Sequence, residues 1–301
     1  QIIMAFLMIA MIAIMLPRAS VAANRVYEII ETKPTIQDPT NPIALDESKK
    51  GLVEFNHVSF AYPGANEPVL KDIDFVAKPG QTTAFIGSTG SGKSTLINLV
   101  PRFYEVSKGS IKVSGVDVRD MTQHELRNHI GLVPQKGNLF SGTIRSNLKY
   151  GAPEATDEEL EEVIRIAQAK EFIDQKEEEG LDTEISQGGT NVSGGQKQRL
   201  AIARAIAKNP DIYIFDDSFS ALDFKTDAKL RQELNQLVKK TKSTVLLVGQ
   251  RIASIMDADQ IIVLDEGRIV GKGTHDELMK SCQVYQEIAY SQLSKEELSH
   301  E

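Results

Sequence analysis

The chain has 301 residues, enough for one large domain or two small ones. Its 41% hydrophobic and 25% charged residues are ordinary for globular proteins. A formal net charge of -8 and a pI near 5.3 argue against a nucleic-acid partner, because nucleic-acid binding usually needs a basic face. The single cysteine, Cys282, excludes an internal disulfide and is compatible with a reducing compartment.

The first segment is strongly apolar, since Ile2 to Leu16 contains no charged or polar side chain. As a helix this run covers roughly 22 Å, short of the roughly 30 Å of hydrocarbon in a bilayer. We expect residues 1–23 to be the C-terminal part of a transmembrane helix whose beginning is missing, with Arg18 and Arg25 marking a cytoplasmic exit. A secretory signal peptide is the alternative, because ASVAA offers a cleavage site, but the run lacks a basic leader.

Residues 24–50 are polar and carry three prolines, which predicts an extended linker. At Gly51 the pattern changes, and LVEFNHVSFAY alternates apolar with polar residues, broken once, as half-buried strands do. A second alternating stretch runs from Ser110 to Val118. We therefore expect a folded domain from residue 51 to about residue 290, followed by a tail over 291–301.

The most informative segment is TTAFIGSTGSGKSTLINLV, residues 82–100. A strand from Thr82 to Ile86 runs into a GxxxxGK motif followed by serine, and a helix follows. The glycines let backbone N–H groups point at phosphate oxygens, and the helix adds its positive end. Lys93 would reach the β- and γ-phosphates, and the Ser94 hydroxyl would ligate Mg²⁺. The predicted phosphate loop is Gly87, Ser88, Thr89, Gly90, Ser91, Gly92, Lys93, Ser94 and Thr95. A glycine-rich turn with a surface lysine is the alternative.

The stretch YIFDDSFSALD supplies the second half of such a site. Its apolar strand, Ile212 to Phe215, delivers Asp216 where an acid can hold a Mg²⁺ ion. A strand-end aspartate that only caps a loop is the alternative. The combination with a phosphate loop favours the metal-binding interpretation.

A third element, NVSGGQKQRLAIARAIAKNP, places Ser193, Gly194, Gly195 and Gln196 at the start of an apolar-periodic helix. Ser193 caps that helix, and its free N–H groups form a second anion-binding end. With this element the sequence resembles the ATP-binding-cassette (ABC) ATPases, whose LSGGQ signature it matches except for Val192 in place of Leu. The resemblance runs from about Gly51 to Tyr290.

The resemblance implies an α/β fold of the P-loop NTPase class: a mixed-sheet core, an antiparallel β-subdomain, and a helical subdomain at about residues 136–205. It implies that Tyr62 stacks on adenine, that Gln135 senses Mg²⁺ and the attacking water, and that Asp223 lies in the loop crossing a dimer interface. Within the helical subdomain, Thr156 and Glu159 predict a capping box that opens a helix over Asp157 to Ala169.

The family resemblance also implies that two cassettes dimerise head to tail. Each ATP then lies between the phosphate loop of one chain and the SGGQ helix of the other. One chain therefore contributes half of two sites, and ATP and Mg²⁺ are the expected cofactors.

Two positions depart from the family pattern. The residue after the Mg²⁺ aspartate is normally Glu, which polarises the attacking water, and here it is Asp217. A histidine that holds the γ-phosphate is replaced by Gln250. Asp is shorter by about 1.5 Å, and a misplacement of about 1 Å can lower a rate on the order of 10²-fold. Loss of one well-placed donor has an effect of about the same size.

We therefore expect a site that binds MgATP and hydrolyses it poorly, with Asp217, Gln250 and Gln135 as its catalytic residues. The intact signature could complete an active site on a partner half-transporter that carries Glu and His, as in asymmetric bacterial ABC exporters of the multidrug type. The alternative is that Asp217 acts through a water and works normally, in a symmetric homodimer.

An apolar helix before the cassette favours an exporter in the cell membrane, integral and multi-pass in its full length, with the cassette facing the cytoplasm. Its own membrane domain is the second expected partner. An importer subunit would lack the fused helix, and a DNA-repair ATPase would need a coiled coil between phosphate loop and signature, for which the chain has no room. A nucleotide-sensing regulatory cassette without transport remains a further alternative.

Overall fold

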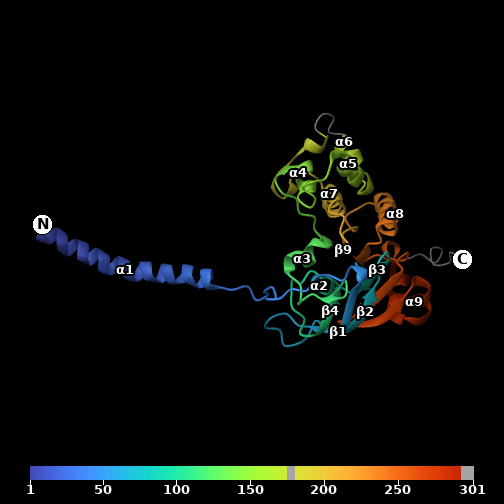
Figure 1. The fold of residues 1–301 in the computed structure, drawn as a ribbon, viewed down its shortest axis with the longest axis horizontal. Helices are drawn as coiled ribbons and strands as arrows, with labels where there is room; N and C mark the ends of the chain where they lie inside the picture. Colours follow the sequence, from blue (N-terminus) through green and yellow to red (C-terminus); the bar gives the residue numbers. More distant parts are fainter. Residues whose placement is uncertain (175–179, 293–301) are drawn as a thin grey trace. The chain divides into compact units, whose positions relative to one another are not determined.

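The computed structural model describes residues 1–174 and 180–292, and Figure 1 shows its course. The chain divides into two compact units, Gln1–Gln37 and Asp38–Glu301. Most of the tail expected over 291–301 lies outside the described residues.

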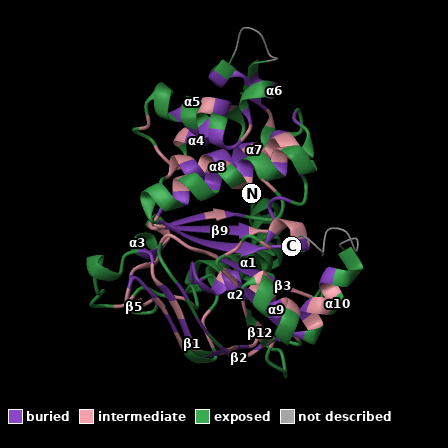
Figure 2. Cartoon of the chain, turned by 90° about the vertical axis from the view of Figure 1, so that its right-hand side faces the viewer, coloured by how far each residue is buried: buried purple, intermediate pink, exposed green. Residues whose placement is uncertain are grey.

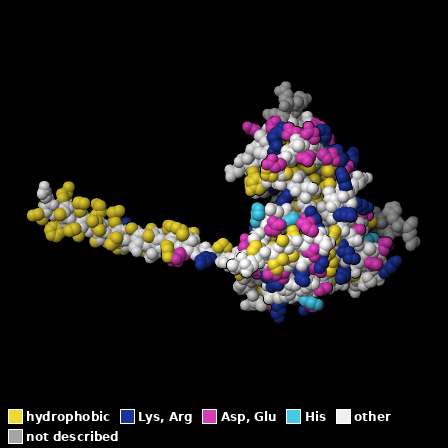
Figure 3. All heavy atoms as spheres, in the orientation of Figure 1, with side chains coloured by type: hydrophobic (Ala, Val, Ile, Leu, Met, Phe, Trp, Pro, Cys, Tyr) yellow, Lys and Arg dark blue, Asp and Glu magenta, His cyan; other side chains and the backbone are white. Residues whose placement is uncertain are grey.

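The first unit is mainly one helix, α1 (Ile2–Glu31), with no buried residue. Within the described part of the chain it is the one helix long and apolar enough to cross a membrane, and Figure 3 shows hydrophobic side chains along it. It continues through Asn24 to Glu31, so the expectation of an extended linker from residue 24 was wrong there. The stretch from Asn24 to Glu31 contains no Pro or Gly that would stop a helix. The helix ends shortly before Pro34, because a proline disfavours helical backbone in the residue that precedes it.

The second unit contains an antiparallel sheet in the order β2-β1-β4-β5. Its strands are β1 (Val53–Phe60), β2 (Leu70–Ala77), β4 (Lys108–Val113) and β5 (Val116–Asp117). The break in the alternation of β1 coincides with a register shift between Phe55 and Val58. The stretch expected as one strand from Ser110 to Val118 is two strands, because Ser114 and Gly115 both adopt positive φ and form a tight hairpin turn.

A second sheet of six strands forms the core, in the order β12-β11-β3-β10-β9-β6. All pairs are parallel except β11 with β12. Figure 2 shows the central strands as buried. The strands predicted from Thr82 to Ile86 and from Ile212 to Phe215 are confirmed. The six strands are β3 (Thr82–Gly87), β6 (Ile130–Val133), β9 (Ile212–Asp216), β10 (Thr244–Val248), β11 (Gln260–Asp265) and β12 (Arg268–Gly273).

Helices surround this core and also form a separate subdomain, at the top of Figure 1. The core helices are α2 (Lys93–Leu99), α3 (Gln123–Asn128), α8 (Phe224–Thr241), α9 (His275–Ser281) and α10 (Gln283–Gln292), with the 3-10 turns η1 (Glu47–Lys49) and η4 (Ile252–Ser254). The subdomain holds α4 (Ile144–Lys149), α5 (Asp157–Ile166), α6 (Lys170–Asp174), α7 (Gly194–Ala207), η2 (Gly180–Asp182), η3 (Gln187–Gly189), and the short strands β7 (Gly142–Thr143) and β8 (Glu184–Ile185).

The capping box predicted for α5 is confirmed, since Thr156 and Glu159 bond each other's backbone N–H groups. The sequence predicted that this helix would end at Ala169, but it ends at Ile166. Gln168 has a φ of 55°, and a left-handed residue of this kind stops an α-helix.

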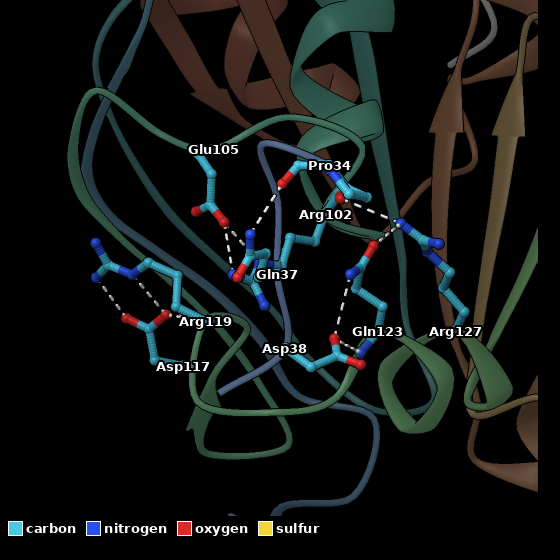
Figure 4. A network of polar contacts seen from close by, with 9 residues as sticks. All are labelled: Pro34, Gln37, Asp38, Arg102, Glu105, Asp117, Arg119, Gln123 and Arg127. Carbon is cyan, nitrogen blue, oxygen red and sulfur yellow. Dashed lines mark hydrogen bonds and ion pairs between the residues drawn. The ribbon is translucent and has the colours of Figure 1, made fainter. Parts of the chain in front are cut away.

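The second half of the expected linker is fastened to the cassette. The Asp38 carboxylate accepts a hydrogen bond from the Gln123 backbone N–H at 2.8 Å, which satisfies a free donor in the first turn of α3 and lowers the pKa of Asp38. Figure 4 shows that the Gln123 side chain in turn accepts from Arg127. Farther along, the Ile43 N–H donates to the Asp120 carbonyl at 2.8 Å, and Lys50 pairs with Asp211 at 3.2 Å.

The turn between β11 and β12 joins the two sheets. The Lys71 N–H of β2 donates to the Gly267 carbonyl at 2.8 Å. Gly267 has a φ of 76°, and a Cβ atom at this position would lie 2.0 Å from the Val69 carbonyl oxygen. Only glycine therefore allows the turn to approach the start of β2.

We expect Gly267→Ala to lower the free energy of unfolding by about 3 kcal/mol or more, because the left-handed backbone and the clash with a backbone oxygen add. Gly64→Ala is the matched control, since Gly64 has a similar φ of 81° with open space around it. Gly64→Ala should lower the free energy of unfolding by only about 1 kcal/mol. Urea unfolding of the two variants measures the difference, and equal losses would show that the contact at Gly267 does not constrain the fold.

Candidate functional site

The phosphate loop connects β3 to α2 at the carboxyl end of the parallel sheet. The Lys93 ammonium donates to the backbone carbonyls of Gly87 and Ser88, at 2.8 Å each, and so lies folded over the loop. Burial lowers the pKa of Lys93, and the charges of Asp217 and Asp216 partly offset that effect. A cation is thus held within a tight loop of backbone, as a binding site for an anion requires.

Asp216 ends the neighbouring strand β9 and meets the start of α2. Its carboxylate accepts a hydrogen bond from the Ser94 hydroxyl at 2.8 Å. Burial raises the pKa of Asp216 above its ordinary value, while the Ser94 bond and the Lys93 charge act in the opposite direction. Two of the three groups predicted from sequence for the metal site, Ser94 and Asp216, therefore lie in contact.

Asp217 follows directly and is 7% exposed. Its φ of 48° is left-handed, a conformation that Asp tolerates better than most residues. One carboxylate oxygen accepts hydrogen bonds from two side-chain amides, that of Gln250 at 2.7 Å and that of Gln135 at 3.2 Å. Burial raises the pKa of Asp217, and the bond from Gln135 and the Lys93 charge lower it in part.

These side chains share one cavity of about 260 Å³. It is lined by Val69, Thr89, Gly90, Gly92, Lys93, Ser94, Thr95, Gln135, Asp216, Asp217, Val248 and Gln250. The structure thus brings together the phosphate loop, both adjacent acids and both glutamines named from the sequence. Val69 was missed, because it precedes β2 and carries no motif; only the folding of β2 against the turn at Gly267 places it here.

Tyr62 lies beside this cavity and not among its lining residues. Its hydroxyl is 2.9 Å from the Thr95 hydroxyl. Its ring meets Phe60 and Tyr104 edge to face, with centroids 4.9 and 5.2 Å away. An aromatic surface therefore stands next to the start of α2.

The signature residues are built as the sequence predicted and lie elsewhere. Ser193 caps α7 and forms a capping box with Gln196, while Gly194 and Gly195 begin the helix. None of the four lines the cavity of the phosphate loop. Asp223 caps α8 by accepting from the Thr226 N–H, which lowers the pKa of Asp223. It lines a different hollow, of about 870 Å³, together with Arg199 of α7.

The donors in the cavity suit ATP and Mg²⁺. Ser94, Asp216 and Gln135 offer a hydroxyl, a carboxylate and an amide oxygen, which are the hard ligands that Mg²⁺ prefers. Gly87, with a φ of 155°, passes so close to β11 that a Cβ atom would lie 2.0 Å from the Leu264 carbonyl oxygen. Only glycine therefore fits at the point where β3 passes into the phosphate loop.

Comparison with known proteins agrees with this geometry. Residues 70–220 match the family model described as ABC transporter. An uncharacterized ABC transporter ATP-binding protein of Mycobacterium tuberculosis is 48% identical over 97% of this chain and 50% of its own length. A putative multidrug export ATP-binding/permease protein of Staphylococcus aureus is 44% identical over 80% of this chain and 41% of its own length.

Among solved structures, a bacterial Atm1-family ABC exporter with ATP bound matches with a TM-score of 0.85 and 32% identity. The match covers 93% of this chain and 48% of that one. The chain thus spans about half the length of the relatives it matches. The expected fold, a P-loop NTPase cassette of the ABC type, is confirmed, and the chain belongs to the ABC transporter family.

Proposed function

We propose that this chain is the ATP-binding and ATP-hydrolysing cassette of an exporter in the cell membrane, facing the cytoplasm and joined to a multi-pass membrane domain. The observation that carries the proposal is the single cavity that gathers Lys93, Ser94 and Asp216. The apolar helix α1 and the exporter named among the similar structures support the membrane assignment.

ATP would bind with its phosphates against the loop from Gly87 to Thr95. Lys93, now held by loop carbonyls, can turn its ammonium toward the β- and γ-phosphates, while backbone N–H groups hold the remaining oxygens. Ser94, Asp216 and Gln135 would hold Mg²⁺, which neutralises charge on the phosphates when bound. Tyr62 offers its ring to the adenine.

A complete site needs a second chain. The signature residues present helix N–H groups suited to phosphate oxygens, yet they lie outside their own chain's cavity. We infer a head-to-tail dimer in which the Ser193 end of α7 faces the nucleotide of a partner. ATP binding would draw the two cassettes together, and Asp223 would lie near the interface.

The site on this chain's own phosphate loop is proposed to turn over slowly. Asp217 is short, and Gln135 and Gln250 both donate to the same carboxylate oxygen, which leaves it less free to orient a water. Gln250 carries no positive charge for a developing phosphate anion. This combination favours a heterodimer in which a partner carrying Glu and His performs most of the hydrolysis.

We expect the double replacement Asp217→Glu with Gln250→His to raise the rate of MgATP hydrolysis by about 10²-fold, because the carboxylate is advanced and a chargeable donor is restored. Steady-state phosphate release by the purified chain measures it.

Lys93→Ala in both backgrounds is the control, and it should abolish the measured rate. A fast wild type that gains nothing from the double replacement would contradict the impaired site and indicate a symmetric ATPase instead.

Since burial raises the pKa of Asp217 above its unfolded value, ionisation destabilises the folded chain. The carboxyl's stabilising contribution is complete below the unfolded pKa of about 3.9 and is lost as the pH rises through the folded-state pKa. Asp217→Asn keeps an acceptor without the charge, so it should raise the Tm of the nucleotide-free protein at pH 8 and less at pH 5.

Asp223→Asn is the matched control, because the pKa of Asp223 is shifted in the opposite direction. It should not raise the Tm at pH 8. Thermal scans at both pH values, without nucleotide or Mg²⁺, measure the effect. An Asp217→Asn gain that is independent of pH would refute the electrostatic explanation.

A further inference from the structure

The segment that carries Gln250 is held from behind by the C-terminal helix α10. The Gln292 side chain donates from its amide nitrogen to the Gln250 carbonyl at 2.8 Å. Its amide oxygen accepts from the Ile252 N–H, also at 2.8 Å. One side chain from the end of α10 therefore bonds the backbone on both sides of Arg251. We call these two hydrogen bonds, from Gln292 to Gln250 and from Ile252 to Gln292, the Gln292 clamp.

In the clamp, the amide oxygen of Gln292 takes the place of a side-chain cap at the start of a 3-10 turn. Ile252 begins the 3-10 turn η4, whose preceding residue, Arg251, makes no side-chain cap hydrogen bond. The first N–H groups of a helical turn have no partner within the turn. The Gln292 oxygen satisfies one of them, and the Ile252 side chain is fully buried beneath it.

The helix that carries Gln292, α10, is itself fixed to the core. Tyr285 and Ala289 of α10 are fully buried in the core. The Gln286 side chain donates to the Met279 carbonyl at 2.7 Å, and the Tyr285 hydroxyl lies 2.7 Å from His275 Nδ1. Because α10 is fixed on its buried face, the position of the Gln292 amide is defined by the core.

The clamp is connected to the candidate site through Gln250. Gln292 bonds the Gln250 backbone carbonyl, and the Gln250 side-chain amide donates to Asp217 at 2.7 Å. On the opposite side of the segment, the Gly249 N–H donates to the Phe85 carbonyl of β3 at 3.1 Å. The Gln250 backbone is thus held between β3 and α10.

We propose that Gln292 is a positioning residue for the nucleotide site: it holds the segment from Gly249 to Ile252 so that the side chain at position 250 faces Asp217 and the γ-phosphate position. This inference rests on the proposed function of the site. Gln292 touches neither nucleotide nor water in this role, and it acts through the backbone of Gln250.

Hydrogen exchange tests the clamp without any turnover. In the full chain without nucleotide, Gln292→Ala should speed exchange of the Ile252 amide by about tenfold, the equivalent of one net hydrogen bond. Gln292→Glu keeps the acceptor and should preserve the protection. Gln283→Ala is the matched control, because Gln283 lies on the same helix and its side chain donates to Glu287 on the surface. Unchanged exchange in Gln292→Ala would overturn the clamp.

Kinetics test the positioning. Gln292→Ala should lower kcat by about tenfold while KM for MgATP and the Tm stay close to those of Gln283→Ala. Gln292→Glu, which lacks the donor to the Gln250 carbonyl, should lower kcat as well. The measurement is made in the wild type and in the Asp217→Glu, Gln250→His background, so that at least one background hydrolyses ATP fast enough for a tenfold fall in kcat to be measured.

The two proposals fail in different ways. A fast wild type that gains nothing from the double replacement refutes the impaired site and leaves Gln292 testable in the wild type. A kcat equal to that of Gln283→Ala in both backgrounds refutes the positioning role, whatever the double replacement does. A parallel fall in Tm and kcat would reduce Gln292 to a structural residue and also overturn the proposal.

Discussion

The parallel pairing of β3, β10 and β9 is the constraint on which the site depends. In this register Val248 of β10 lies between Phe85 of β3 and Asp216 of β9. The three strands therefore end at the same edge, although their residues are far apart in the sequence. The phosphate loop, the two acids and the Gln250 segment begin where the strands stop. A slip in any of these pairings would separate the groups that share the cavity.

The same edge concentrates charge in a poorly solvated place. Asp216 and Asp217 are adjacent, and burial raises the pKa of both, while Lys93 is the cation beside them. Ionised carboxylates in such surroundings destabilise the nucleotide-free fold. A bound metal would offset that charge, which is why the arrangement fits a site for a magnesium nucleotide better than a structural ion pair.

The proposed division of the site between two chains rests on the position of α7. Its capped N-terminus, at Ser193, is fully formed within the chain, so it needs no partner to fold. It does not reach its own phosphate loop, and its N–H groups are available to another nucleotide. The proposed asymmetric pair is compatible with this arrangement, because this chain supplies an intact signature even though Asp217 and Gln250 stand where the family has Glu and His.

The sequence alone determined the local features: the phosphate loop, the capping box at Thr156, the cap at Ser193, and the strands that begin at Thr82 and Ile212. These depend on residues close together in the chain, so their patterns are legible without the fold. The tertiary structure decided that Gln135 and Gln250 share one oxygen of Asp217, that Val69 lines the cavity, and that Gln292 holds the Gln250 backbone. Such contacts join strands and helices distant in sequence, and no local pattern encodes them, because they arise only when packing of the core fixes the distances between elements.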